Sequence, residues 1–132
     1  PAAFDVSDRH FRRSGMDYLE RAAVARHDSF ATFDQWRREH GHRLVLAETD
    51  GAIQLPDFHF QPGDLVLLGR ESAGVTAEAR AAADTSLHIP MRTGLRSLNV
   101  ALAAAMVMGE ALRQTGGFPG RDGTDDDHLE TR

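Results

Sequence analysis

The sequence contains neither cysteine nor lysine, and each absence excludes a class of chemistry. Without cysteine, the 132-residue chain cannot form disulfides, bind zinc through thiolates or use a thiol nucleophile, a composition that fits a reducing compartment. Without lysine, it has no Walker A phosphate-binding loop. All fifteen basic residues are arginine, which suits phosphate binding, although a GC-rich genome explains the bias more simply.

Long apolar runs are also missing. The longest, residues 100–108, is too short to span a bilayer, and the first residues show no signal-peptide pattern. The chain has the length of one domain, and its 41% hydrophobic residues are enough for a core. The net charge is −5, and much of it lies in residues 120–132, which we expect to form a disordered acidic tail after a domain of residues 1–119.

Short apolar runs alternate with helical patterns along the chain. Continuous apolar strands between helices predict an α/β fold, in which a parallel sheet is covered by helices on both faces. We expect Met106 and Met108, in the last helix, to lie in the core. The expected strands are 44–47, 65–68, 86–89 and a short one within 18–24, with a loop at 50–63; the expected helices are 7–14, 29–40, 76–83 and 97–115.

Two glycine-containing loops follow two of the predicted strands, where α/β proteins bind ligands. The first, Gly69–Gly74, lacks the glycine two residues before Ser72 that a hydrolase nucleophile elbow requires, and it has no G-x-G-x-x-G spacing. It could be a purely structural turn. The carboxylate of Glu71, however, is poorly placed for packing and well placed to bind a ligand or to fix the neighbouring loop.

The second loop leads from Ile89-Pro90 into the long helix. Ser97 is the expected N-cap, which is a structural explanation for that residue. Asn99 would then lie in the first turn, where asparagine competes with the helix backbone, so both side chains could face a ligand at the helix N-terminus. The alanines of residues 101–105 would let another backbone approach closely.

The remaining polar clusters are less specific. The seven histidines have no metal-binding spacing, so we expect no metal site. Arg9, Arg12 and Arg13 lie close together on the first predicted helix, and two interpretations stay open for them. They form either a solvated face or a basic patch that contacts RNA phosphates.

The two loops, in this order and spacing, resemble motifs 2 and 3 of the SPOUT superfamily of RNA methyltransferases. Residues 67–74 are similar to motif 2, and Ile89–Met91 followed by Arg96–Asn99 is similar to motif 3. Phe11–Tyr18 with Arg26 and His27 resembles the small single-domain branch, the tRNA 2′-O-methyltransferases that act on the wobble cytidine or uridine. The resemblance extends over residues 1–119.

This resemblance implies a cytoplasmic, homodimeric tRNA methyltransferase with a deep C-terminal trefoil knot, paired through its long last helix. It implies that Glu71, Ser97 and Asn99 organise the catalytic site. The implied S-adenosylmethionine pocket is lined by Ala47, Gly69, Ile89, Met91, Ser97 and Leu98.

Motif 1, with an arginine proposed to help activate the ribose hydroxyl, is expected upstream of Pro1 in this family. We therefore expect the 132 residues to lack the first strand and helix, and to be impaired in catalysis on their own. The alternative is a non-catalytic domain that binds S-adenosylmethionine or RNA. The failed motif checks disfavour a hydrolase or nucleotide-binding fragment.

Overall fold

The computed structural model describes residues 23–69, 74–95 and 98–120, and the chain divides into two units, residues 1–40 and 41–132. The expected helix 7–14 and the acidic tail beyond Gly120 lie outside the described residues. So does most of the strand expected within 18–24, whose two described residues form no strand.

In the first unit, helix α3 spans Phe30–Glu39, as the sequence predicts for residues 29–40. Its first turn is closed by a capping box: the Thr32 amide donates to the Ser29 hydroxyl over 3.1 Å, and the Ser29 amide donates to the Thr32 hydroxyl over 3.1 Å. The rings of Phe33 and Trp36, one turn apart on this helix, stack with centroids 6.4 Å apart.

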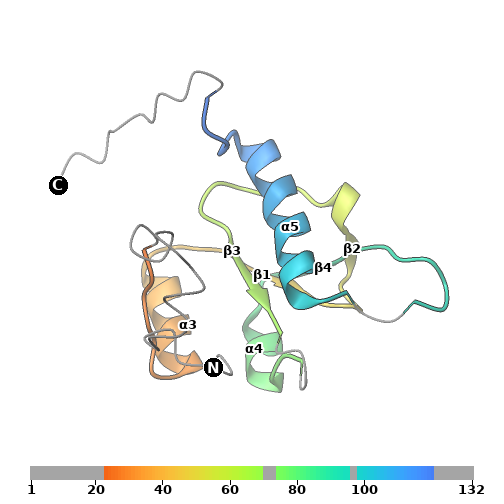
Figure 1. The fold of residues 1–132 in the computed structure, drawn as a ribbon. Coiled ribbons are helices and arrows are strands. Elements are labelled where there is room, and N and C mark those ends of the chain that lie inside the picture. Colours follow the sequence, from red (N-terminus) through yellow and green to blue (C-terminus); the bar gives the residue numbers. More distant parts are fainter. Residues whose placement is uncertain (1–22, 70–73, 96–97, 121–132) are drawn as a thin grey trace, which may run out of the picture. The chain divides into compact units, whose positions relative to one another are not determined.

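The second unit is built on a parallel sheet in the order β2-β4-β1-β3 (Figure 1). Its apolar strands pair in register, so that Val45 lies beside Val66 on one side and beside Thr85 on the other. The parallel α/β architecture predicted from the sequence is confirmed. The strands are β1 Leu44–Ala47, β2 Ile53–Gln54, β3 Leu65–Leu68 and β4 Thr85–His88; the helices are α4 Ala77–Ala82, α5 Val100–Thr115 and a 3-10 turn, Leu55–Asp57.

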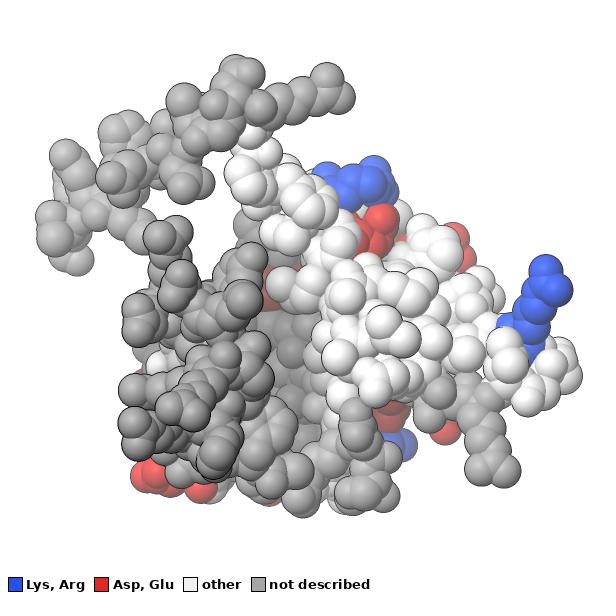
Figure 2. Space-filling view, viewed as in Figure 1, with Lys and Arg blue, Asp and Glu red and all other residues white. Residues whose placement is uncertain are grey.

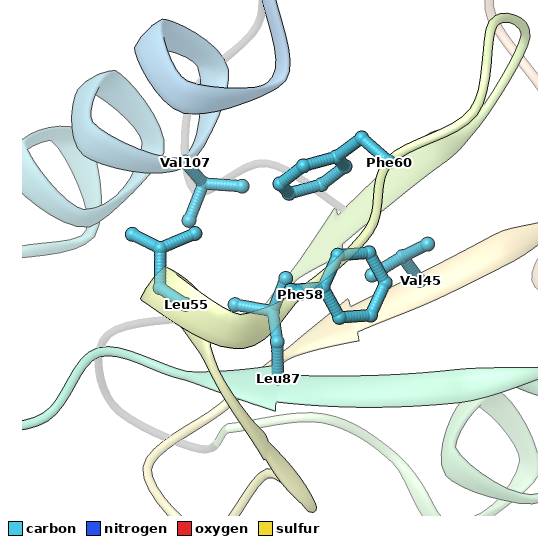
Figure 3. Close-up of a cluster of buried hydrophobic side chains, with 6 residues drawn as sticks. All are labelled: Val45, Leu55, Phe58, Phe60, Leu87 and Val107. Carbon is cyan, nitrogen blue, oxygen red and sulfur yellow. The ribbon is translucent and has the colours of Figure 1, made fainter. Parts of the chain in front are cut away.

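The main core lies between α5 and one face of this sheet (Figure 3). Val45 and Leu87 come from adjacent central strands, and Val107 from the middle of α5; all three are fully buried. Helix α4 lies on the opposite side of the sheet from α5 (Figure 1), and its Ala79 is buried. The core cluster of Val45, Leu87 and Val107 also includes Leu55, Phe58 and Phe60 from the segment between β2 and β3.

A single side chain ties the end of α5 to that segment. The Gln114 amide group donates to the Phe58 carbonyl over 2.8 Å, and its carbonyl oxygen accepts from the Phe60 amide over 2.8 Å. Both backbone groups lie in a part-buried setting, where an unmade hydrogen bond is costly. Gln114 thus provides hydrogen-bond partners for two backbone groups in a segment that belongs to no strand.

Hydrogen bonds to carboxylates, one of them from an arginine, hold the amino-terminal ends of three strands together. Arg43 donates from Nε and Nη2 to the two carboxylate oxygens of Asp64, over 2.9 and 2.6 Å. The central carbon of its guanidinium lies 5.4 Å from the centroid of the Phe58 ring. The hydrogen bonding of Arg43 to the Asp64 carboxylate raises the pKa of Arg43 above its ordinary value. Because the Leu44 amide also donates to Asp84, the starts of β1, β3 and β4 are joined here, at the edge opposite the strand ends that carry the loops.

Three expectations from the sequence are wrong. Residues 50–63 are not simply a loop, because Ile53–Gln54 forms the edge strand β2 and a 3-10 turn follows it. Helix α5 begins at Val100 rather than Ser97. Met106 and Met108 are each 48% exposed rather than buried, because Val107 between them faces the sheet. None of the described helices combines the length and apolar character that a membrane-spanning helix requires.

We predict that Gln114→Ala lowers the free energy of unfolding by about 1–3 kcal/mol, because it leaves the Phe58 carbonyl and the Phe60 amide without their partner. Urea unfolding measures this change. The matched control is Gln61→Ala at an exposed position, which is expected to stay within about 0.5 kcal/mol of the parent protein. Equal stability of the two variants would contradict the role given to Gln114.

Candidate ligand pocket

A pocket of about 460 Å³ opens at the carboxyl ends of β1, β3 and β4, all within the second unit. Residues that directly follow each strand form its floor, and the start of α5 forms a wall. The lining residues are Ala47, Glu48, Thr49, Asp50, Leu68, Gly69, Gly74, Val75, Arg80, Leu87, His88, Ile89, Met91, Leu98, Asn99, Val100 and Ala103.

The strand order explains why a pocket forms at this place. From β1 the chain passes through β2, at the far edge beyond β4, to β3 on the other side of β1, and then through α4 to β4. Strands β3 and β4, which flank β1, lead into α4 and α5 on opposite sides of the sheet (Figure 1). The loops that leave the carboxyl ends of β3 and β4 therefore diverge around the end of β1. Open parallel sheets bind ligands in the crevice at such a switch point.

The first glycine loop closes tightly where it leaves β3. A Cβ placed on Gly69 would lie 2.9 Å from the carbonyl carbon of Gly74 and 3.1 Å from the Val75 side chain. Gly74 has a φ of +64°, in the left-handed region that glycine adopts without strain. Both glycines line the pocket, so the narrow approach of the two loop ends is part of its wall.

The loop after β1 is fixed over the end of β4. The Glu48 amide donates to the Leu87 carbonyl over 3.0 Å, and Nδ1 of His88 lies 2.6 Å from the Gly51 carbonyl oxygen. Because that oxygen can only accept, Nδ1 carries the proton in this contact. A Cβ on Gly51 would come within 2.0 Å of the Leu87 oxygen, so only glycine allows this approach.

The second glycine loop runs from β4 to α5. The Leu95 amide donates to the Arg92 carbonyl over 3.2 Å, and Gly94 has a φ of +90°, as a tight turn with glycine at its third position requires. Met91, just before this turn, lines the pocket. The sequence predicts a ligand site at this loop, and its residues Met91 and Leu98 line the pocket. The turn lies between the two parts of the motif.

Asn99 has a different structural role from the one expected. It is the N-cap of α5, and its side-chain oxygen accepts from the Ala101 amide over 2.8 Å. Asparagine and serine cap helices about equally well, so the sequence around residues 97–99 does not decide between them. Asn99 still lines the pocket, and by starting the helix there it sets where Val100 and Ala103 lie.

The structure brings most of the predicted pocket residues together. Ala47, Gly69, Ile89, Met91 and Leu98 all line this one pocket. The predicted residues Glu71, Ser97, Arg9, Arg12 and Arg13 lie outside the described residues.

Sequence reasoning missed five polar lining residues: Glu48, Thr49, Asp50, Arg80 and His88. Two of them could have been noticed, because Glu48 directly follows β1 and His88 ends β4. Arg80 lies in the middle of α4 and gave no such signal. Across residues 23–69, 74–95 and 98–120, no group of three or more acidic or histidine side chains could hold a metal ion.

The fold is that of an α/β protein with a pocket at the switch point of a parallel sheet, which is a candidate small-molecule site. Residues 1–109 match the model of the SpoU rRNA methylase family. The chain belongs to this family.

Curated and solved relatives agree with this assignment. The chain is 60% identical over 124 residues to a tRNA (cytidine(34)-2′-O)-methyltransferase of Ancylobacter novellus, covering 94% of this chain and 78% of the relative. It is similar to a structure described as giving insights into the 2-OH methylation of C/U34 on tRNA, with a TM-score of 0.79 and 36% identity over 89% of this chain and 76% of the other. The methyltransferase AviRb of Streptomyces viridochromogenes, solved with AdoMet, gives a TM-score of 0.77 and 34% identity over 85% of this chain and 46% of its own.

We predict that Asn99→Ala destabilises the protein by about 0.5–2 kcal/mol, because the amide of Ala101 loses its cap. Asn99→Asp keeps a capping oxygen and serves as the matched control, with a change of only a few tenths of a kcal/mol. Chemical denaturation monitored by circular dichroism measures both. If the alanine variant unfolds at the same denaturant concentration as the aspartate variant, the capping role is wrong.

Proposed function

We propose that this protein transfers a methyl group from S-adenosylmethionine to the ribose 2′-oxygen of nucleotide 34, the wobble cytidine or uridine, of tRNA. The observation that carries the proposal is the pocket itself, where residues of both family-like loops meet at the ends of three parallel strands. The names of the relatives that match most of this chain support the substrate and the reaction. With tRNA as substrate, the proposed place of action is the cytoplasm.

The chemistry of the pocket fits S-adenosylmethionine. Its volume of about 460 Å³ falls in the usual range for small ligands. Leu87 and Ile89 at one strand end, with Val100 and Ala103 of α5, supply an apolar wall suited to a nucleoside. Gly69 lines another part of the pocket, where a Cβ would come within 2.9 Å of the Gly74 backbone. Ala47, Gly69, Ile89, Met91 and Leu98 are the residues that would hold the cofactor, together with Ser97.

Bound S-adenosylmethionine supplies an electrophilic methyl group on a sulfonium sulfur. The protein contributes chiefly alignment, because holding two reacting groups in line lowers the barrier without covalent help. Two features fix the pocket walls: the close approach of Gly69 to Gly74, where the two ends of the first glycine loop meet, and the capped start of α5. We assign Glu71, Ser97 and Asn99 to organising this site, with Asn99 acting as a positioning residue through the helix that it caps.

Recognition of tRNA is proposed for Arg9, Arg12 and Arg13. Arginine forks suit phosphate oxygens, and contacts of this kind weaken as salt competes for the backbone. The trefoil knot of the SPOUT superfamily is likewise part of the proposal. It is supported by the family assignment and by the way in which the loops after β3 and β4 line one pocket with the start of α5.

The face of α5 that points away from the sheet supports a homodimer. Leu102 is 59% exposed and Met106 is 48% exposed, one turn apart, and Figure 2 shows few charged side chains over this helix. Small residues at four-residue intervals, Ala101, Ala105 and Gly109, lie along the same face. An exposed apolar stripe with small residues allows a second helix to approach closely, as self-association requires.

A non-catalytic domain that binds S-adenosylmethionine or RNA is the alternative, and one experiment separates the two. Purified protein, tRNA with cytidine or uridine at position 34 and labelled S-adenosylmethionine are expected to give a 2′-O-methylated nucleotide 34, detected by mass spectrometry. The product is expected to form slowly, in line with the impaired catalysis expected of these 132 residues. Gly69→Ala is expected to lower methyl transfer and cofactor affinity together, about 10-fold or more, because a methyl group between the two loop ends displaces the pocket wall.

Gly120→Ala is the control, because nothing lies within 4 Å of a Cβ at that position. Cofactor binding without any transfer by the parent protein would favour the non-catalytic alternative. Unchanged affinity in Gly69→Ala would show that the cofactor does not use this pocket.

We predict that Met106→Glu converts the protein to a monomer in analytical ultracentrifugation, because a carboxylate cannot be buried unpaired in an apolar interface. Ala31→Glu, at an exposed position of α3, changes the net charge equally and is expected to keep the dimer. A parent protein that sediments as a monomer, or a Met106→Glu variant that remains dimeric, would contradict pairing through α5.

A further inference from the structure

The polar groups that line the pocket include an ion pair. The guanidinium of Arg80, on α4, lies 2.8 Å from a carboxylate oxygen of Glu48, which follows β1. The Glu48 side chain is 17% exposed and that of Arg80 is 55% exposed, and both residues line the pocket. A partly shielded ion pair therefore faces the space that the ligand would occupy.

Each side chain of this ion pair has hydrogen-bonding groups that the pair itself does not use. A guanidinium has five N–H donors in a planar fork, and one carboxylate uses at most two of them. The Glu48 carboxylate has two oxygens, of which the ion pair uses Oε2. A ligand that carries both an anionic and a cationic group could therefore bond to Arg80 and Glu48 at the same time, with charge-assisted hydrogen bonds.

The backbone around the pair is fixed before any ligand arrives. The amide of Glu48 donates to the Leu87 carbonyl over 3.0 Å, and the amide of Gly51 donates to the Glu48 carbonyl over 3.2 Å. The start of α4 is held by Thr76, whose hydroxyl accepts from the Ala79 amide over 3.2 Å. Both charged side chains thus project from anchored elements, which reduces the entropy lost on binding.

Apolar residues also line the pocket: Leu87 and Ile89 from the end of β4, Leu98 before α5, and Val100 and Ala103 within it. A pocket with apolar lining residues and one ion pair suits a ligand that has an apolar body and a zwitterionic end. An α-amino acid group, with its ammonium and carboxylate on one carbon, is such an end.

We propose that Glu48 and Arg80 form the subsite for the amino-acid group of the methyl donor, with Arg80 binding its carboxylate and Glu48 its ammonium. This inference rests on the proposed function. It assigns to the two residues a role in specificity, because they would select adenosyl ligands that carry an amino acid over those that do not. A purely structural ion pair between β1 and α4 would show no such selection, and neither would a contact of Glu48 with ribose hydroxyls.

Two neutral thioether ligands separate these interpretations. S-adenosylhomocysteine and 5′-methylthioadenosine share the adenosine and the sulfur, and only the first carries the amino-acid group. Calorimetric titration of the purified protein with each ligand is the measurement. Arg80→Gln and Glu48→Gln are each expected to weaken S-adenosylhomocysteine binding about 10- to 100-fold, since each removes a charge-assisted contact. The affinity for 5′-methylthioadenosine is expected to change less than about twofold.

Two further variants complete the design. Arg38→Gln removes another arginine whose ion pair, with Asp34, spans 2.8 Å, and because it does not line the pocket it should leave both affinities unchanged. Arg80→Lys keeps the positive charge and is expected to recover part of the lost affinity, and it also serves if Arg80→Gln fails to fold, which circular dichroism would reveal.

The outcomes distinguish the subsite from the proposed function. If the parent protein binds both ligands and the variants lose affinity for both equally, or for neither, the subsite is wrong and the methyl-donor pocket stands. If the parent protein binds neither ligand, the proposed function fails together with the subsite.

Discussion

The burial of one face of α5 against the sheet is the constraint on which the rest of the second unit depends. Val107 is fully buried in one cluster with Val45 and Leu87 (Figure 3), and Gln114 fastens the other end of the helix to the backbone at Phe58 and Phe60. Once the helix is fixed along this line, its first turn must lie at the carboxyl ends of the strands. The same packing directs Leu102 and Met106 away from the sheet. One hydrophobic contact therefore places both a pocket wall and a surface suited to a second copy.

The two edges of the sheet have separate tasks. At the amino-terminal edge, Arg43, Asp64 and Asp84 join three strands through charge-assisted hydrogen bonds, and this edge carries stability. At the carboxyl edge, glycines allow approaches that no other residue permits, as at Gly51 beside the Leu87 carbonyl. Polar side chains at these strand ends, such as Glu48 and His88, line the pocket. This division is typical of parallel α/β proteins, in which the strand ends that lead into loops carry the site.

Much of this arrangement could be predicted from the sequence, and the exceptions have physical reasons. The strands at 44–47 and 65–68 are short apolar runs between turn residues, and residues 86–89 alternate polar and apolar side chains, so the type and chain positions of these strands followed directly. The edge strand at Ile53–Gln54 has only two residues and gains its partner from distant β4, which no local pattern reveals. The methionines were misplaced because an apolar helix face can be buried by the sheet or left for a partner, and hydrophobicity alone does not decide which. Arg80 entered the pocket through a tertiary contact with Glu48, 32 positions away along the chain.

The central claim is that the ends of β1, β3 and β4, with the start of α5, form the methyl-donor site. Its most direct test is the mapping of amide chemical-shift changes by nuclear magnetic resonance as S-adenosylhomocysteine is added to the labelled protein. We predict saturable changes concentrated at residues 47–50, 68–69, 74–75, 87–89, 91, 98–100 and 103, which line the pocket. Saturable binding with its largest changes at the opposite edge, around Arg43 and Asp64, or no binding at all, would contradict the account.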